Sequence, residues 1–487
     1  MAKASIFGSQ KTVHKLATLL AIGIAIFLCF WKLGAAQVED WDEARRGMNA
    51  LGMMHFNDYL RLYYGLEPDG WAAKPPLAIW AIIGSYKLFG VGELALRFHS
   101  ALSVSLFFVV FNSVLKQVLN NQFRVIALLV AASMSGFIGF HVARNGDTDG
   151  MLLFWLWLGT WALFKSFRKE KWLLLAALFY GLAFYTKGAA TFLFLPGIVL
   201  TIIIIKPNWF KPKSGIFWAS LVTYALIAGS WVYIQAQYGH HNLKETSIST
   251  GNSLSQMFYY DVIERFSNEN FDPNGRDLLA LFPALDTTMG IWNYLFFASL
   301  ILATPLLFKR KVKATFQILK DNPLLLLAVV QVAIICCIYT FSASKHRWYL
   351  TPFLPFLIII MLVVFQNQAK KLKGIIWLIG GLVVVSLSIR FNDVNKPKNL
   401  LALEFEQVFN YMQPTDTVYF ADNPRQAHRL YLSWHVGVEK VKANKIKSAE
   451  QLSPNKWIYF KQNSRAVNKD HLMLFEVGEY YLGLSKK

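Results

Sequence analysis

The segment PLAIWAIIGSYKLFG, residues 76–90, decides the topology of the rest of the chain. It is apolar enough to enter a membrane, but fifteen helical residues reach only about 22 Å, whereas the hydrocarbon core of a bilayer is roughly 30 Å thick. Ser85, Tyr86 and Lys87 also interrupt its apolar character. We therefore predict that this segment lies along the membrane surface and does not cross it.

Eleven other apolar segments are predicted to cross the membrane. Of the 487 residues, 55% are hydrophobic and only 16% are charged, whereas a soluble protein carries about 25% charged residues. Apolar runs long enough to cross a bilayer, such as those given next, are typical of transmembrane helices. The predicted spans cover residues 14–33, 95–116, 123–142, 149–167, 171–186, 189–206, 215–235, 289–308, 323–342, 348–366 and 373–390. The predicted fold is a polytopic α-helical membrane protein with about 11 transmembrane helices.

The positions of the charged residues predict the orientation. The net charge of +20 would suit a nucleic-acid partner, but the basic residues gather in alternate loops, so we expect no nucleic acid. With residues 76–90 on the surface, one set of loops holds 19 basic residues against only Glu170 and Asp321. The 19 are Lys3, Lys11, Lys15, Lys116, Arg124, Arg168, Lys169, Lys171, Lys206, Lys211, Lys213, Lys309, Arg310, Lys311, Lys313, Lys320, Lys370, Lys371 and Lys373. Basic loops mark the cytoplasmic side, so the N-terminus is predicted to be cytoplasmic.

Three regions are then predicted to be extracytoplasmic: residues 34–94, residues 236–288, and everything after about residue 390. If residues 76–90 crossed the membrane, every later loop would change sides and break the positive-inside rule. The tail has helical periodicity in LLALEFEQVFNYM, and strand patterns in TVYFA, KWIYFKQ and LMLFEVGEYYLGL. We therefore predict a transmembrane domain over residues 1–390 and a small soluble α/β domain over residues 391–487.

The first external loop opens with VEDWDEARRGMNALG, residues 38–52. Asp40 or Asp42 is expected to cap a helix that starts here and lies in the membrane interface. Glu43 follows directly, so two carboxylates sit at the end of this helix, close to the membrane surface. A capping acid surrounded by solvated charge would explain part of this pattern. Capping needs one acid, however, and the segment holds more.

Further along the loop, GWAAKPPLAIW places Lys74 before two prolines that can start the surface helix. A cation at a helix N-terminus is unfavourable for the helix itself, because the dipole there is already positive. It becomes favourable if an anion such as a phosphate binds at the same place. The alternative is an ordinary lysine anchored at the membrane surface.

Three other polar clusters are predicted to face the same side of the membrane. They lie in HVARNGDTDGML, FYTKGAATFLFLP and FSASKHRWYLTPFLP, and Arg97 begins the second span. The charged and polar residues of these clusters are Arg144, Asp147, Asp149, Lys187, Lys345, His346, Arg347 and Tyr349. Each one alone could be an interfacial anchor. Together they place carboxylates among a ring of cations at one membrane face.

This arrangement suits a substrate with a lipid tail and a phosphate. The tail would occupy the bilayer, the cations would neutralise the phosphate, and a carboxylate would activate an acceptor or stabilise positive charge on a sugar. A lipid or sugar transporter, including a flippase without transferase activity, is the alternative. Transporters often carry internal repeats and polar residues near the midplane, but this sequence has no clear repeat and its polar residues gather at one face.

The sequence resembles the C-type, membrane-embedded glycosyltransferases, and most closely the bacterial aminoarabinose transferase and protein O-mannosyltransferase families. DEARRGMNALGM resembles their acidic first-loop motif, KPPLAIW their proline-proline-leucine motif, and ARNGDTDGMLLFW their second-loop aspartate segment. YTKGAATFLFLP and SKHRWYLTPFLPFL resemble two later motifs. The motifs occur in the order of the family, over roughly residues 12–390.

The resemblance implies an inverting transfer of a sugar from a polyprenyl-monophosphate donor to an envelope acceptor on the extracytoplasmic face of the inner (plasma) membrane. It implies Asp42 as the catalytic carboxylate, with Glu43 and Asp149 as further candidates. Donor-phosphate contacts are implied for Lys74, Arg97, Arg144, Lys187, Lys345, Arg347 and Tyr349. The acceptor is left open between lipid A, another glycan and a protein.

One departure from the family pattern concerns a metal. Many aminoarabinose transferases carry an acidic residue just before the first-loop lysine, and this chain has Ala73 there. No cofactor is therefore expected with certainty, and a divalent metal is left open. The same departure weakens lipid A as the expected acceptor.

Overall fold

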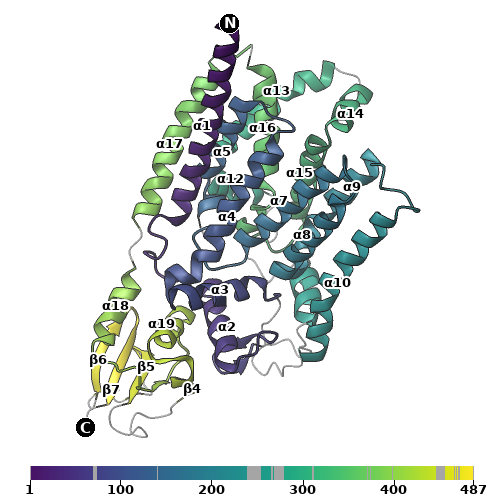
Figure 1. Cartoon of the computed structure of the whole chain (residues 1–487). Coiled ribbons are helices and arrows are strands. Elements are labelled where there is room, and N and C mark those ends of the chain that lie inside the picture. The colour runs from purple at the N-terminus through teal and green to yellow at the C-terminus, as the bar shows by residue number, and fades with distance from the viewer. Residues whose placement is uncertain are drawn as a thin grey trace.

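The structure is a computed structural model that describes residues 2–69, 74–139, 141–238, 254–264, 267, 279–309, 312–369, 371–372, 374–396, 399–445, 456–464, 467, 469 and 472–485. Most of the chain is helical, and a small mixed sheet lies near the C-terminus (Figure 1). The first part contains α1 (Ala2–Phe30), α2 (Asp42–Phe56), β1 (Tyr63–Tyr64), β2 (Glu67–Pro68), α3 (Leu77–Phe89), α4 (Glu93–Leu115), α5 (Asn121–Ser133), α6 (Ser135–Ile138), α7 (Asp149–Ser166), α8 (Trp172–Lys187), η1 (Gly188–Leu193), α9 (Leu195–Ile205) and α10 (Gly215–Tyr238).

The second part contains η2 (Ser255–Glu264), α12 (Leu281–Met289), α13 (Trp292–Lys309), α14 (Val312–Asp321), α15 (Pro323–Phe341), η4 (Arg347–Leu350), α16 (Leu354–Gln368), α17 (Ile375–Asn395), α18 (Leu400–Phe409), β3 (Val418–Phe420), α19 (Gln426–Val436), η5 (Val438–Lys440), β4 (Val441–Lys445), β5 (Trp457–Lys461), β6 (Leu472–Val477) and β7 (Tyr480–Ser485). Of the predicted external region 236–288, a large part lies outside the described residues.

The decisive segment forms the short helix α3. It begins directly after Pro76 and ends at Phe89, and the next residue, Gly90, has a positive φ of 80° that suits a glycine. Its apolar residues Ile79, Ile82 and Ile83 are buried in a cluster shared with α2 and the C-terminal part of the chain. Figure 1 shows α3 beside α2, at the end of the helical bundle opposite the N-terminus.

Six helices of the described chain are long and apolar enough to cross a membrane, or seven if the bent pair α12–α13 counts as one span. The six are Gln10–Phe30, Glu93–Leu115, Trp172–Leu193, Gly215–Gln237, Pro323–Phe341 and Ile375–Phe409. Shorter apolar helices are α3, α5, α9 and α16. The predicted spans 189–206 and 348–366 each begin with a 3₁₀ turn, η1 and η4, which shortens the α-helix that follows. The prediction of eleven spans stays a prediction.

The C-terminal region, Leu400–Ser485, forms a five-stranded sheet in the order β4-β3-β5-β7-β6. Strand β3 runs parallel to β4 and β5, and the hairpin β6–β7 adds to β5 in the antiparallel sense. The predicted helix and strands of the tail are confirmed, whereas α19 and β4 were not predicted. Helix α19 packs against α2. The C-terminal region and the first loop therefore lie on the same side of the bundle.

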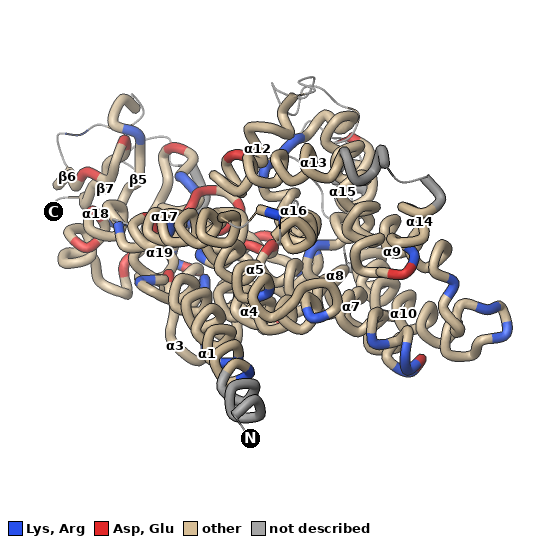
Figure 2. The backbone as a smooth tube through the Cα atoms, turned by 90° about the horizontal axis from the view of Figure 1, so that it is seen from above, with Lys and Arg blue, Asp and Glu red and all other residues tan. Residues whose placement is uncertain are grey.

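Helices α7 and α8 are antiparallel neighbours, and α7 also packs against α4. The first residue of α7 and the last residue of α8 consequently meet at the same end of the bundle. Seen from above, lysine and arginine colour the loop between α9 and α10, one of the predicted cytoplasmic loops (Figure 2).

Candidate active site

Asp42 is the first residue of α2, and two cations face its carboxylate. The Nζ of Lys74 lies 3.6 Å from Oδ1 of Asp42, and the Nη2 of Arg46 lies 3.8 Å from the same oxygen. The side chain of Asp42 keeps 36% of its surface exposed, against 0% for Glu43 and 2% for Asp149. Of the three predicted catalytic carboxylates, Asp42 is therefore the one that a substrate can reach without rearrangement of the site.

A second carboxylate, Asp147, lies in the loop between α6 and α7 and is buried. The Nε of Arg46 lies 3.7 Å from its Oδ1, and Nδ1 of His141 donates a hydrogen bond of 2.8 Å to its Oδ2. Arg46 therefore contacts both acidic segments, through Asp42 in the first loop and Asp147 in the loop before α7. Asp147 belongs to one of the predicted polar clusters but was not among the predicted catalytic residues.

Both carboxylates are held in the ionised form. The positive charge of Lys74 lowers the pKa of Asp42 below its ordinary value, although burial and the neighbouring Asp147 act in the opposite direction. Burial raises the pKa of Asp147, but the charge of Lys74 and the hydrogen bond from His141 outweigh it, so that this pKa lies well below the ordinary range. Both groups are consequently deprotonated at neutral pH.

Asp149 and Lys187 form a buried pair beneath this cluster. Asp149 opens α7, and Lys187 ends α8, so the antiparallel packing of the two helices brings them together. The Nζ of Lys187 lies 2.6 Å from Oδ1 and 2.5 Å from Oδ2 of Asp149. Tyr349 lies near enough to Lys187 to interact with it electrostatically.

Glu43 and Arg97 form a closed pair that holds three segments together. Arg97 donates hydrogen bonds of 2.6 and 2.9 Å to the two carboxylate oxygens of Glu43. It also donates to the backbone carbonyl groups of Leu33, Ala36 and Gln37. The N–H groups of Glu39 and Gly146 donate to Glu43 in turn. Both side chains are buried, and their hydrogen-bonding groups are used within the protein.

Arg144 ends up at the C-terminus of α1. Its guanidinium donates to the carbonyl oxygens of Leu28, Cys29, Trp31 and Lys32. The last carbonyl groups of a helix have no intrahelical partner, and a cation near them is favourable. These contacts place Arg144 at the edge of the site.

The turn η4 brings the late motif to the same place. Trp348 stacks on His141 with 4.1 Å between the ring centroids, and His346 stacks on Trp348 at 4.5 Å. Lys345 is buried before this turn, whereas Arg347 is exposed. The donor-binding candidates Lys345, Arg347 and Tyr349 are therefore anchored next to the Asp147 loop through Trp348, which was not among the predicted site residues.

Within the part of the chain that the structure describes, one group of residues could hold a metal ion. Ligand atoms of Asp42, His141 and Asp147 all lie within 4.8 Å of one another, and carboxylate and imidazole groups are suitable ligands for Zn²⁺ or Mn²⁺. Arg46 and Lys74 already face the two carboxylates, however, and their charges oppose a divalent cation. The donor types fit a metal and the local charge does not. Ala73 lies outside the described residues.

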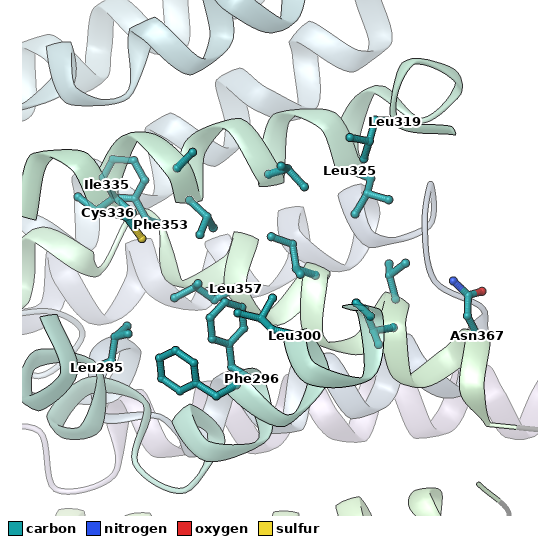
Figure 3. A pocket seen from close by; sticks show the side chains of 18 of the residues that line it. Leu285, Phe296, Leu300, Leu319, Leu325, Ile335, Cys336, Phe353, Leu357 and Asn367 are labelled. Carbon is teal, nitrogen blue, oxygen red and sulfur yellow. The ribbon is translucent and has the colours of Figure 1, made fainter. Parts of the chain in front are cut away.

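An apolar cavity of about 1010 Å³ extends among α12, α13, α14, α15 and α16 (Figure 3). Leu350 of η4 and Phe353 line the cavity, and Asn367 of α16 lies at the end of the cavity away from Phe353 (Figure 3). Its lining is otherwise mostly aliphatic and aromatic. The cavity therefore begins on the same turn that carries Arg347 and Tyr349.

One prediction about the first loop was wrong. Helix α2 has no side-chain cap, because its N-cap residue is Trp41. The Asp40 carboxylate instead accepts the N–H of Ala427, at the start of α19. Arg46, the fifth residue of α2, contacts Asp42 across one turn of the helix, as expected from their i, i+4 spacing in the sequence.

Comparisons with known proteins agree with this picture. Residues 73–234 match the dolichyl-phosphate-mannose-protein mannosyltransferase family. An uncharacterised protein of Aquifex aeolicus is 24% identical over 77% of this chain and 70% of its own length. YkcB of Bacillus subtilis, provisionally named a mannosyltransferase, is 29% identical over 39% of this chain. The matched segment covers only 25% of YkcB.

Two solved structures share the fold. ArnT from Cupriavidus metallidurans, solved with undecaprenyl phosphate, superposes with a TM-score of 0.71 at 13% identity, covering 96% of this chain and 97% of ArnT. The oligosaccharyltransferase AglB of Archaeoglobus fulgidus, solved with an inhibitory peptide and a dolichol-phosphate, gives a TM-score of 0.52 at 12% identity, covering 88% of this chain and 64% of AglB. The chain therefore shares the fold of ArnT and AglB, and its residues 73–234 are similar to the dolichyl-phosphate-mannose-protein mannosyltransferases.

Proposed function

We propose that this protein transfers a sugar from a polyprenyl-monophosphate donor to an acceptor in the cell envelope, with inversion at the anomeric carbon. The acceptor is lipid A, another glycan or a protein. The reaction takes place on the extracytoplasmic face of the inner membrane, with the N-terminus in the cytoplasm and the C-terminal region outside. The observation that carries the proposal is the reachable carboxylate of Asp42 among cations. A cavity suited to a lipid tail is lined by Leu350, which lies on the same turn as Arg347 and Tyr349.

The donor would bind with its phosphate among the cations. Lys74 lies just before the N-terminus of α3, where unpaired N–H groups and the helix dipole also favour an anion. Arg347 and Tyr349 lie on η4, and Lys345 directly precedes this turn. The apolar cavity starts at Leu350 on the same turn, so a phosphate held by η4 would leave its isoprenoid tail at the mouth of that cavity. The undecaprenyl phosphate in the ArnT structure supports this class of donor.

The chemistry assigned to Asp42 is that of a general base. An acceptor hydroxyl attacks the anomeric carbon on the face opposite the phosphate, and Asp42 takes the hydroxyl proton as the new C–O bond forms. The bond between the sugar and the phosphate oxygen breaks, and polyprenyl phosphate leaves with its electron pair. Lys74 and the cations of η4 would stabilise the charge that develops on this phosphate. No step requires a metal, although Asp42, His141 and Asp147 are the residues that would hold one.

The remaining predicted site residues divide into two groups. Asp149 and Lys187 would shape the floor of the site, since their charges compensate each other and lie near Asp147 and Tyr349. For Glu43, Arg97 and Arg144, the contacts favour a positioning role over contact with the substrate. The hydrogen bonds of Glu43 and Arg97 join α2, α4 and the loop 139–148, and those of Arg144 go to the end of α1.

A lipid or sugar transporter without transferase activity is the competing function. A transporter would need charged residues along a path through the bilayer, whereas the charges described above gather at one end of the bundle.

Mass spectrometry of envelope lipids, glycans and proteins from a deletion strain tests the proposal and identifies the acceptor. We expect one class of molecule to lose a sugar and to regain it when the wild-type gene is restored, but not when the gene encodes Asp42→Asn. A deletion strain that instead accumulates an unflipped lipid-linked sugar, with full complementation by Asp42→Asn, would favour transport.

A further inference from the structure

The loop that carries Asp42 is bound to the C-terminal region through the residue two positions earlier. Oδ1 of Asp40 accepts the N–H of Ala427 at 2.9 Å, and Oδ2 lies 3.6 Å from Nε of Arg425. The first N–H groups of any helix lack an intrahelical partner. Arg425, the N-cap residue of α19, provides no side-chain bond to them. Asp40 thus caps a helix that lies 387 residues away in the sequence.

The residue between Asp40 and Asp42 has a strained backbone. Trp41 has a φ of 69° and a ψ of −103°, although it is not a glycine. Bulky side chains rarely adopt a positive φ, and such a conformation persists only where the surroundings impose it. Here Asp40 is held by α19 on one side. On the other side α2 has already begun, since the N–H of Arg45 donates to the carbonyl of Trp41 at 2.8 Å. The strain therefore lies at the connection between the C-terminal region and the Asp42 carboxylate.

Two further contacts attach the same loop to α19. The hydroxyl of Tyr431 accepts the N–H of Val38 and donates to Glu93 at the start of α4. Gly47 of α2 packs directly on Leu430, so closely that an added Cβ would lie 2.6 Å from Cδ2 of Leu430. Helix α19 therefore contacts the chain on both sides of Asp42. It contacts Val38 and Asp40 before this residue and Gly47 after it.

We infer that the C-terminal region sets the position of the catalytic carboxylate, and that Asp40 is the positioning residue that transmits this. The inference rests on the proposed function and gives the C-terminal region a role in it. The carboxylate of Asp40 faces α19 and accepts a hydrogen bond there. We therefore assign it the role of fixing the direction in which the side chain of Asp42 points. The cations assigned to the donor phosphate, Lys74 and those of η4, lie on other segments. Loss of the Asp40 contact should therefore slow turnover without weakening donor binding.

The test uses the full-length protein and compares Asp40→Ala with Asp40→Asn. The amide oxygen of Asn can still accept the Ala427 N–H, whereas Ala cannot. We expect Asp40→Ala to lower the rate at which the envelope product forms by about ten- to hundredfold, because small displacements of a reacting group have effects of this size. Asp40→Asn should stay within about threefold of the wild-type rate. It keeps an acceptor for the Ala427 N–H, so Asp42 should be displaced much less than in Asp40→Ala. Binding of undecaprenyl phosphate to the protein in vesicles should be unchanged in both. Glu406→Ala, an exposed acid of α18, is the matched control.

Hydrogen exchange supplies a readout that does not depend on activity. The backbone amides of residues 42–47 should exchange faster in Asp40→Ala than in wild type or Asp40→Asn. If Asp40→Ala does not fold, Arg425→Gln at its exposed site should lower the product rate by about twofold, within the range of exposed ion pairs. Wild-type activity and exchange in Asp40→Ala would overturn the inference, and so would an Asp40→Asn variant as inactive as Asp40→Ala. If Asp42→Asn is also fully active, the assignment of Asp42 as the base fails and the inference fails with it, whereas wild-type exchange in Asp40→Ala beside an inactive Asp42→Asn overturns only the role of Asp40.

Discussion

The Nζ of Lys74 lies 3.6 Å from Oδ1 of Asp42, although the two residues are 32 positions apart in the first loop. Lys74 precedes α3 and Asp42 begins α2. The contact therefore links the proposed phosphate ligand to the proposed general base. If a donor phosphate binds Lys74, the positive charge of Lys74, which keeps Asp42 ionised, is shared between Asp42 and the phosphate.

The first prediction follows from this contact. Because the charge of Lys74 lowers the pKa of Asp42, Lys74→Gln should raise that pKa toward or above its ordinary value. Activity that requires ionised Asp42 is lost as the pH falls through its pKa, so the acid limb of the kcat/KM profile should move to higher pH in the variant. Lys87→Gln, on α3 but bonded to Tyr59, is the control. An acid limb at the same pH in Lys74→Gln and wild type would show that another group controls it.

The second prediction separates the two neighbouring acids of α2. Glu43→Gln removes the negative partner of Arg97, which is buried, and an uncompensated buried charge costs about 3–5 kcal/mol. We therefore expect a clear fall in the Tm of Glu43→Gln in detergent, and a Tm close to wild type for Asp42→Asn. A Glu43→Gln variant that is inactive but melts like wild type would instead make Glu43 part of the catalytic chemistry.

The third prediction concerns metal dependence. Arg46 and Lys74 already balance the charges of Asp42 and Asp147, so transferase activity should survive dialysis against EDTA. The measurement is the transfer rate before and after chelation, with added Mn²⁺ or Zn²⁺ as a control. Activity that disappears with EDTA, returns with one of these ions, and is absent in His141→Ala would assign a metal to Asp42, His141 and Asp147.

The fourth prediction concerns the side of the membrane on which each segment lies. In a protein whose native cysteines Cys29, Cys336 and Cys337 are replaced by alanine, Glu67→Cys and Glu479→Cys should react with an impermeant reagent from outside. Lys171→Cys should react only after permeabilisation. The reason is that α3 is predicted to lie on the membrane surface, which would put the first loop and the tail on the same side. Labelling at position 67 with protection at 479 would mean that α3 crosses the membrane.

The sequence predicted those features that depend on composition and local period. The helical course of α1, α4, α8, α10, α15 and α17 follows from long apolar runs, and the surface position of α3 was argued from its length and charges. The motifs around Asp42, Lys74, Asp149 and Lys187 could be selected because charge is costly near a membrane and needs a reason.

The contacts between these motifs could not be predicted, because they depend on packing between distant segments. Nothing local in the sequence indicates that Asp40 caps α19 or that Trp348 stacks on His141. Arg97 and Arg144 looked like phosphate ligands because a cation at a membrane face fits that role. The structure instead gives Arg97 a buried partner, Glu43, and places Arg144 on the carbonyl groups of α1. The 3₁₀ turns η1 and η4 were also not predicted, because hydropathy does not distinguish a 3₁₀ turn from an α-helix.

The transfer rate of Asp42→Asn tests the central claim most directly. The substitution keeps the size of the side chain, removes its ability to take a proton, and leaves the buried pair of Glu43 and Arg97 intact. With an unchanged Tm, we predict that turnover of the lipid-phosphate sugar falls by at least about a hundredfold. Full activity of Asp42→Asn, with Asp149→Asn or Glu43→Gln inactive at an unchanged Tm, would contradict the assignment of Asp42 as the base, and full activity of all three variants would contradict the transferase mechanism proposed for this site.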